Sequence, residues 1–106
     1  MLVERRRGRA AFLESVVDDL HLSNVEVFPR TAEELTGPFE TVVARAYASP
    51  AATWSAASRL LAPGGKLVYW AGEGFDPASE GLASVSVRFS TSPTLADSGP
   101  LVIMAR

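Results

Sequence analysis

The chain of 106 residues contains no cysteine and a single histidine, His21. Disulfide bonds and cysteine-based metal sites are therefore excluded, and one histidine leaves too few ligands for an ordinary transition-metal site. The sequence also lacks an apolar run long enough to cross a bilayer. A charged run begins after three residues, where a signal peptide would have its apolar centre. These absences predict a cytoplasmic protein without a membrane segment.

Two common catalytic motifs are missing as well, the Gly-x-Ser-x-Gly nucleophile turn and the phosphate-binding loop. The net charge of only -2 argues against indiscriminate binding of polyanions, yet the charge is unevenly placed. Four of the ten basic residues lie between Arg5 and Arg9. The composition, 47% hydrophobic and 21% charged, is globular. The length fits one small domain, and we predict a single domain over residues 1–106.

The first third of the chain is predicted to form a strand, a helix, a second strand and a helical turn. Leu2-Val3 is a short strand-like piece, and residues 6–22 carry apolar side chains at helical spacing, which predicts an amphipathic helix. Residues 25–28 predict a strand that ends at Pro29. Thr31 and Glu34 have the spacing of a capping box, so a helical turn is expected between them. Glu33-Glu34 is therefore interpreted as a capped turn and not as a catalytic pair.

The rest of the chain continues this alternation. Residues 39–44 include Thr41-Val42-Val43-Ala44, a nearly continuous apolar run that is typical of a central parallel strand. Ser49-Pro50 begins a helix that we expect Pro63-Gly64-Gly65 to terminate. The remaining strands are predicted at residues 67–71, 84–89 and 101–104, and the last two form an antiparallel pair. This order predicts an α/β fold with right-handed crossovers.

Glu4 is a candidate ligand-binding residue because it follows a strand directly. In a doubly wound sheet, an acid at the carboxyl end of the second strand accepts hydrogen bonds from a ribose, and about 20 residues of glycine-rich loop and helix normally precede it. Here only three residues precede Glu4. The alternative is that Glu4 offsets the charge of the neighbouring arginines.

The basic run is a candidate RNA-binding surface. Four cations at the amino terminus of a helix oppose the helix dipole, which makes an anionic partner favourable. The alternative is a solvated helix start. The residues of this run are Arg5, Arg6, Arg7 and Arg9.

Arg45 lies at the carboxyl end of a predicted buried strand, where open α/β sheets bind ligands. Its guanidinium can hold a carboxylate or a phosphate through paired donors. The alternative is a structural ion pair with Glu33, Glu34 or Glu40. We interpret His21 as a surface residue at a helix end. Three aromatic residues are assigned to the core: Trp54, Tyr69 and Trp70. Tyr69 and Trp70 could instead stack on a base.

Taken together, several segments resemble the carboxyl-terminal half of the small-subunit ribosomal RNA guanine-N7 methyltransferases, the RsmG or GidB family. The resemblance extends over most of the chain. Its most specific segments are Leu2-Val3-Glu4 with Arg5-Arg6-Arg7, Ala10-Ala11-Phe12-Leu13, Asn24-Val25-Glu26-Val27, Ala32-Glu33-Glu34 and Val43-Ala44-Arg45-Ala46-Tyr47-Ala48. Pro63-Gly64-Gly65 is shared by many methyltransferases and adds little.

The resemblance implies an S-adenosylmethionine-dependent enzyme that acts on small-subunit rRNA. It implies that Glu4 contacts the cofactor ribose, that Ala32 and Glu33 border the adenine, and that Arg45 lies at the cofactor and substrate site. It also implies a Rossmann-like methyltransferase sheet with strand order 3-2-1-4-5-7-6 and a terminal antiparallel pair. The partner would be rRNA or the small ribosomal subunit.

The sequence departs from the family at three places. The glycine-rich first motif and the first strand have no counterpart here, so the residues that hold the methionine portion are absent. Trp70-Ala71-Gly72 stands where the family has a lysine before glycine, and Gly99-Pro100 replaces an expected basic residue. Without the first motif, cofactor binding is expected to be weak. The alternatives are a non-catalytic RNA-binding or scaffold module, or a fragment that needs an amino-terminal partner.

The missing first strand would lie between the strands that end at Glu4 and Arg45, which leaves two unpaired edges. Three solutions are open at this point. Residues 2–4 pair directly with residues 39–44; a second copy or another polypeptide fills the gap; or the coding sequence is truncated or its start is misassigned.

Overall fold

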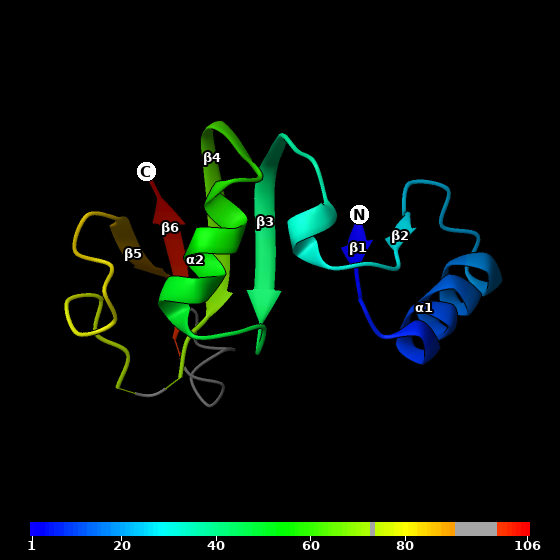
Figure 1. The fold of residues 1–106 in the computed structure, drawn as a ribbon, viewed down its shortest axis with the longest axis horizontal. Helices are drawn as coiled ribbons and strands as arrows, with labels where there is room; N and C mark the ends of the chain where they lie inside the picture. The colour runs from blue at the N-terminus through cyan, green and yellow to red at the C-terminus, as the bar shows by residue number, and fades with distance from the viewer. Residues whose placement is uncertain (73, 91–99) are drawn as a thin grey trace. The chain divides into compact units, whose positions relative to one another are not determined.

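The computed structural model describes residues 1–72, 74–90 and 100–106 (Figure 1). In chain order the elements are β1 (Leu2–Val3), α1 (Arg7–Asp19), β2 (Val27–Phe28), the 3-10 turn η1 (Ala32–Glu34), β3 (Phe39–Arg45), α2 (Pro50–Ser58), β4 (Leu61–Trp70), β5 (Ser86–Ser90) and β6 (Leu101–Ala105). The chain divides into two compact units, Met1–Thr36 and Gly37–Arg106, and each is described on its own. The departure at Gly99 lies outside the described residues.

The first unit is a single strand, helix and strand motif. β1 and β2 pair in parallel, with Leu2 opposite Val27 and Val3 opposite Phe28. Helix α1 connects them as predicted, but it begins at Arg7 and ends at Asp19, which is shorter than the predicted range. Ala10 is the residue that this helix buries, while other apolar side chains of its stripe are half-buried or exposed.

The carboxyl terminus of α1 ends in a Schellman motif. The backbone N–H of His21 donates to the Asp18 carbonyl oxygen at 3.2 Å, and the N–H of Leu22 donates to the Val17 carbonyl oxygen at 3.0 Å. His21 supplies the left-handed residue that the motif requires, with φ of 52°. Glycine usually occupies this position because a side chain makes the left-handed conformation unfavourable.

We therefore expect His21→Gly to stabilise the protein. Removal of the Cβ relieves a conformational cost of about 1 kcal/mol, partly offset by the greater freedom of glycine in the unfolded chain. The free energy of unfolding, measured by urea denaturation followed by circular dichroism, should rise. His21→Ala is the control, because alanine keeps the Cβ and should give no gain. Equal stability of both variants would contradict the explanation.

The predicted capping box is confirmed at the 3-10 turn. The backbone N–H of Thr31 donates to the Glu34 carboxylate at 3.3 Å, and the turn η1 follows directly. The box fixes the direction in which the chain leaves β2.

The second unit is a four-stranded sheet with the order β3-β4-β6-β5 (Figure 1). β3 and β4 are parallel, and the pairs β4·β6 and β5·β6 are antiparallel. The predicted closing pair is therefore confirmed. The two sheets, β2-β1 and β3-β4-β6-β5, have the expected order 3-2 and 4-5-7-6 that remains when strand 1 is absent. The Rossmann-like α/β class is thus confirmed.

Each of the two strands in question has a strand neighbour on one side within its own unit. β1 pairs with β2 in the first sheet, and β3 is an edge strand of the second sheet and pairs with β4. The three solutions for the other side of each strand stay predictions.

One face of the second sheet is closely packed. α2 covers this face, and its Ala57 joins the cluster of buried residues from β4 and β6. The predicted core positions of Trp54 and Tyr69 are confirmed, since Tyr69 is buried and Trp54 packs against the cluster, while Trp70 is only half-buried. The buried strand residues are Leu67, Tyr69, Val102 and Met104.

The predicted end of α2 at Pro63-Gly64-Gly65 is wrong. The helix starts as expected, with the Ser49 hydroxyl accepting from the Ala52 N–H at 3.3 Å, but it ends at Ser58. The three residues lie inside β4, where the register against β3 shifts between Phe39 and Thr41. Gly64 has φ of 77°, and a Cβ on Gly65 would lie 2.9 Å from the Ala62 carbonyl oxygen. The glycines therefore form an irregularity in a strand.

Among the described residues, no helix is long and apolar enough to cross a membrane.

Candidate functional site

Glu4 and η1 lie at the same edge of the first sheet. Glu4 follows β1 directly, and η1 follows β2 after Pro29, Arg30 and Thr31. Because β1 and β2 are parallel neighbours, their carboxyl ends meet at one edge, where open α/β sheets bind ligands. The backbone N–H of Glu4 donates to the Phe28 carbonyl oxygen at 3.1 Å, which continues the ladder to the edge. The structure thus brings Glu4, Ala32 and Glu33 to one edge.

The Glu4 carboxylate has a local role in addition to any ligand contact. One of its oxygens, Oε1, accepts from the backbone N–H of Arg6 at 3.0 Å. Arg6 is the N-cap residue of α1, and its own side chain makes no capping hydrogen bond. An ionised carboxylate offers about four acceptor positions, so this bond leaves acceptors for ribose hydroxyls. The half-buried side chain of Glu4 can serve both purposes.

The four arginines of the basic run lie at the start of α1 as predicted. All four side chains are exposed, and the first turn of the helix contains no acidic residue. The positive end of the helix dipole adds to their charge. Contact between RNA and this basic run stays a prediction. The positive electrostatic potential at the start of the helix supports it, because this potential attracts anions. The residues concerned are Arg5, Arg6, Arg7 and Arg9.

Arg45 lies in the second unit, as the last residue of β3, and its side chain is exposed. The next residue, Ala46, has φ of 53°, an uncommon conformation for alanine. The backbone therefore turns sharply just after Arg45. Non-glycine residues in this conformation are often found at functional sites, which makes the turn notable.

Two hydroxyl groups anchor the segment after Arg45. The hydroxyl of Tyr69 donates to the Ala48 carbonyl oxygen at 3.3 Å, and the Thr53 hydroxyl donates to the same oxygen at 3.2 Å. Both residues are buried. Burial raises the pKa of Tyr69, and the negative charge of Glu80 raises it further, so the hydroxyl keeps its proton.

The sequence analysis assigned Tyr69 to the core and did not identify this anchoring role. The hydrogen bond joins residues 21 positions apart, so no local pattern signals it. The predicted helix start at Ser49-Pro50 implies that Thr53 lies one turn after Ala48. That spacing was the available signal for the hydrogen bond from Thr53 to Ala48.

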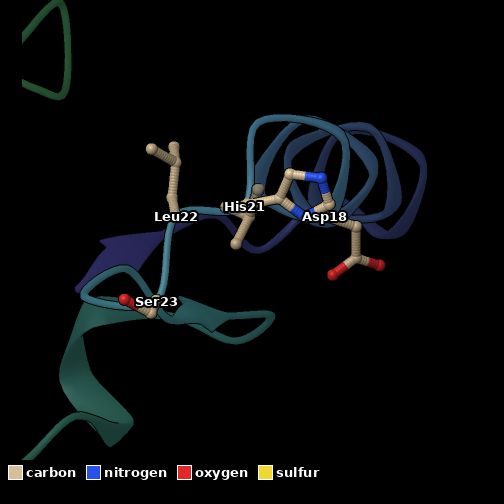
Figure 2. Close-up of a pocket in the computed structure, with 5 residues that line it drawn as sticks. Asp18, His21, Leu22 and Ser23 are labelled. Atoms are coloured by element: carbon tan, nitrogen blue, oxygen red, sulfur yellow. The ribbon is translucent and has the colours of Figure 1, made fainter.

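A shallow pocket lies at the carboxyl terminus of α1 (Figure 2). His21 is exposed there, as predicted for a surface residue. Within residues 1–72, 74–90 and 100–106, no three acidic or histidine side chains are grouped as a metal site. The pocket is lined by Val17, Asp18, His21, Leu22 and Ser23.

Comparisons with known proteins agree with the resemblance. Residues 1–83 match the family GidB, described as rRNA small subunit methyltransferase G. The chain is similar to the ribosomal RNA small subunit methyltransferase G of Acidiphilium cryptum (strain JF-5), with 35% identity over 107 residues. This match covers 96% of the chain and 48% of the relative. The chain therefore spans about half the length of the curated relative.

Solved structures show the same fold at lower identity. A candidate rRNA methylase from Clostridium thermocellum superposes with a TM-score of 0.60 at 18% identity, covering 96% of this chain and 68% of that one. An rRNA methylase from Streptococcus thermophilus gives a TM-score of 0.56 at 14% identity, covering 96% and 69%. At these identities the likeness concerns the fold alone.

Proposed function

The chain belongs to the rRNA small subunit methyltransferase G family, and on that premise we propose that it carries the adenosine-binding edge and the RNA-binding arginines of a cytoplasmic S-adenosylmethionine-dependent rRNA methyltransferase. The target atom proposed is guanine N7 of small-subunit rRNA. The observation that carries the proposal is the position of Glu4 beside η1, at the shared edge of two parallel strands.

The residues present fit the adenosine part of the cofactor. Glu4 retains free acceptor positions for the ribose hydroxyls, and the backbone of Ala32 and Glu33 borders the place of the adenine. Arg45 would contact the cofactor or the RNA from the end of β3. When bound, the cofactor supplies an electrophilic methyl group on a sulfonium.

Positioning is the main task of the protein in such a reaction. The N7 lone pair of guanine is already nucleophilic, so the chain needs no general base. What remains is to hold the guanine and the cofactor in line, which lowers the barrier through orientation. Glu4 and η1 would orient one reactant, and the arginines at the start of α1 would hold the RNA that carries the other.

Titration with S-adenosylhomocysteine tests the adenosine-binding edge. We expect weak binding by isothermal calorimetry, and Glu4→Gln should weaken it further by about 10- to 100-fold. Hydrogen bonds to a charged group contribute about 1.5–3 kcal/mol, which corresponds to such a loss. Glutamine keeps one oxygen for the Arg6 N–H, so the helix start should remain intact.

Glu14→Gln is the matched control, since Glu14 is exposed on α1 and outside the edge. It should leave the affinity unchanged. Equal affinities of Glu4→Gln and the unaltered chain would exclude the ribose contact.

A second candidate function follows from the exposed arginines. A module that binds RNA without cofactor would retain RNA affinity while showing no calorimetric response to S-adenosylhomocysteine. That combination in a folded chain would favour the non-catalytic module.

A further inference from the structure

A short turn joins β3 to α2 and begins at Arg45 (Figure 1). β3 ends at Arg45 and α2 begins at Pro50, so residues 46–49 connect the two elements. Ala46, the first of them, has φ of 53°. This left-handed conformation is unfavourable for a residue with a Cβ, and it persists only where the surrounding structure fixes it. The turn therefore needs an anchor.

The carbonyl oxygen of Ala48 is this anchor, because it accepts two hydrogen bonds from side chains. The Tyr69 hydroxyl donates from β4 at 3.3 Å, and the Thr53 hydroxyl donates from α2 at 3.2 Å. Tyr69 is 6% exposed and Thr53 is 2% exposed. The oxygen is thus held from a strand and from a helix at once. Displacement of the turn would break two hydrogen bonds whose donors belong to buried residues, which is unfavourable.

The bond from Thr53 differs from the usual bond of a helical threonine. A threonine hydroxyl in a helix normally bonds to the carbonyl oxygen three or four residues earlier. Here the carbonyl oxygen of Ser49, four residues earlier, accepts the backbone N–H of Thr53 at 2.8 Å, and the hydroxyl reaches one residue further to Ala48. Tyr69 belongs to the buried cluster, for which a phenylalanine ring would be sufficient. Both hydroxyls therefore serve the turn in particular.

The strand register separates the two hydroxyls from the Arg45 side chain. Ala44 lies opposite Tyr69, and both pack in or against the buried cluster on the α2 side of the sheet. Successive side chains of a strand point to opposite faces, so Arg45 directs its side chain to the other face. Tyr69 and Thr53 therefore act on Arg45 through the backbone of the turn, without touching its guanidinium.

We infer that Tyr69 and Thr53 are positioning residues for Arg45. By fixing the Ala48 carbonyl oxygen they hold Ala46 in its left-handed conformation and so set the direction in which the Arg45 guanidinium meets its ligand. A guanidinium binds a carboxylate or a phosphate through paired donors, which requires a defined orientation. The inference rests on the proposed function, in which Arg45 contacts the cofactor or the RNA.

Loss of both hydroxyls should loosen the turn. Tyr69→Phe and Thr53→Val remove the hydroxyls and keep the ring and the branched shape of the side chains. In this double variant, backbone order parameters of residues 46–48, measured by NMR relaxation, should fall from about 0.85 to about 0.6 or lower. The order parameters of β3 should not change. Thr53→Ser keeps a hydroxyl and should preserve the order of the turn.

Ligand binding shows whether the anchor acts on Arg45. The probes are S-adenosylhomocysteine, followed by calorimetry, and a labelled rRNA oligonucleotide, followed by fluorescence anisotropy. Arg45→Gln should weaken the binding of one probe. For that probe, Tyr69→Phe with Thr53→Val should weaken binding about 3- to 10-fold, and by less than about twofold in the Arg45→Gln background. Ser55→Ala removes an exposed hydroxyl from the same helix and should leave the affinity unchanged.

Four results would overturn the inference. Unchanged order parameters in the double variant would show that the hydroxyls do not fix the turn. Weaker binding on Arg45→Gln alone would exclude positioning and leave the proposed function intact. Equal losses in both backgrounds would show a general structural role. No effect of Arg45→Gln on either probe would remove Arg45 from the site.

Failure of the proposed function would give a different result. Neither probe would bind to the folded, unaltered chain, and the order parameters would then decide on the anchor alone.

Discussion

Neutralisation of the four arginines at the start of α1 should remove most of the salt-dependent binding of RNA. If each of Arg5, Arg6, Arg7 and Arg9 neutralises one phosphate of a single strand, the slope of log affinity against log salt is about -2.8. The affinity of the unaltered chain should then fall by about 50-fold between 50 and 200 mM salt. Replacement of all four by glutamine should flatten this dependence, as measured by fluorescence anisotropy with a labelled rRNA oligonucleotide.

A control with the same change in net charge separates local from overall electrostatics. Arg30, Arg59, Lys66 and Arg88 lie outside the basic run, and their replacement by glutamine should leave most of the salt slope in place. The two sets should also differ in stability. Removal of cations from the amino terminus of α1 relieves their repulsion by the helix dipole, so the first variant should unfold at a higher urea concentration than the control variant. Equal slopes for the two variants would show that the run is only a solvated helix start.

Truncation of Leu67 should produce the largest loss of stability. Leu67 is 0% exposed at the centre of the second sheet, and Leu67→Ala should lower the free energy of unfolding by about 3–5 kcal/mol through lost burial and the cavity that remains. Val68→Ala, one residue along β4, is the control because this half-buried side chain points to the face of the sheet opposite Leu67. It should cost about 1 kcal/mol or less. A similar cost for both would contradict the assignment of the core.

The same experiment tests whether residues 1–106 unfold as one domain. Both tryptophans and both tyrosines lie after Thr36, so aromatic fluorescence reports only the second unit. Far-ultraviolet circular dichroism also follows α1 in the first unit. Coincident transitions in Leu67→Ala would support a single domain, whereas a helical signal that persists after the fluorescence transition would show independent units.

Periodicity located the strands and helices along the sequence but not all of their ends, since α2 ends at Ser58 and β4 already begins at Leu61. The apolar run of β3 predicted a central strand, yet Val43 is exposed and β3 lies at the edge of its sheet. The sequence of β3 is typical of a strand with neighbours on both sides. The residue pattern of a segment indicates how deeply that segment can be buried. The strands and helices that pack against the segment decide how deeply it is buried.

Backbone conformation and long-range contacts were harder to predict. The left-handed residues His21 and Ala46 carry no local signal, since glycine or asparagine usually marks such positions. The bond from Tyr69 to Ala48 depends on the sheet and helix being assembled. For Glu4, the sequence predicted a ligand-binding position, while its bond to the Arg6 N–H became visible only in the structure.

The short ladder between β1 and β2 has a thermodynamic consequence. Each strand has only two residues, and such a small sheet contributes few cross-strand contacts to hold the edge where Glu4 and η1 lie. Local opening of this ladder would require less free energy than opening of the four-stranded sheet. A ligand at this edge would therefore spend part of its interaction energy on restricting the backbone, and its binding should be enthalpically favourable with an entropic penalty.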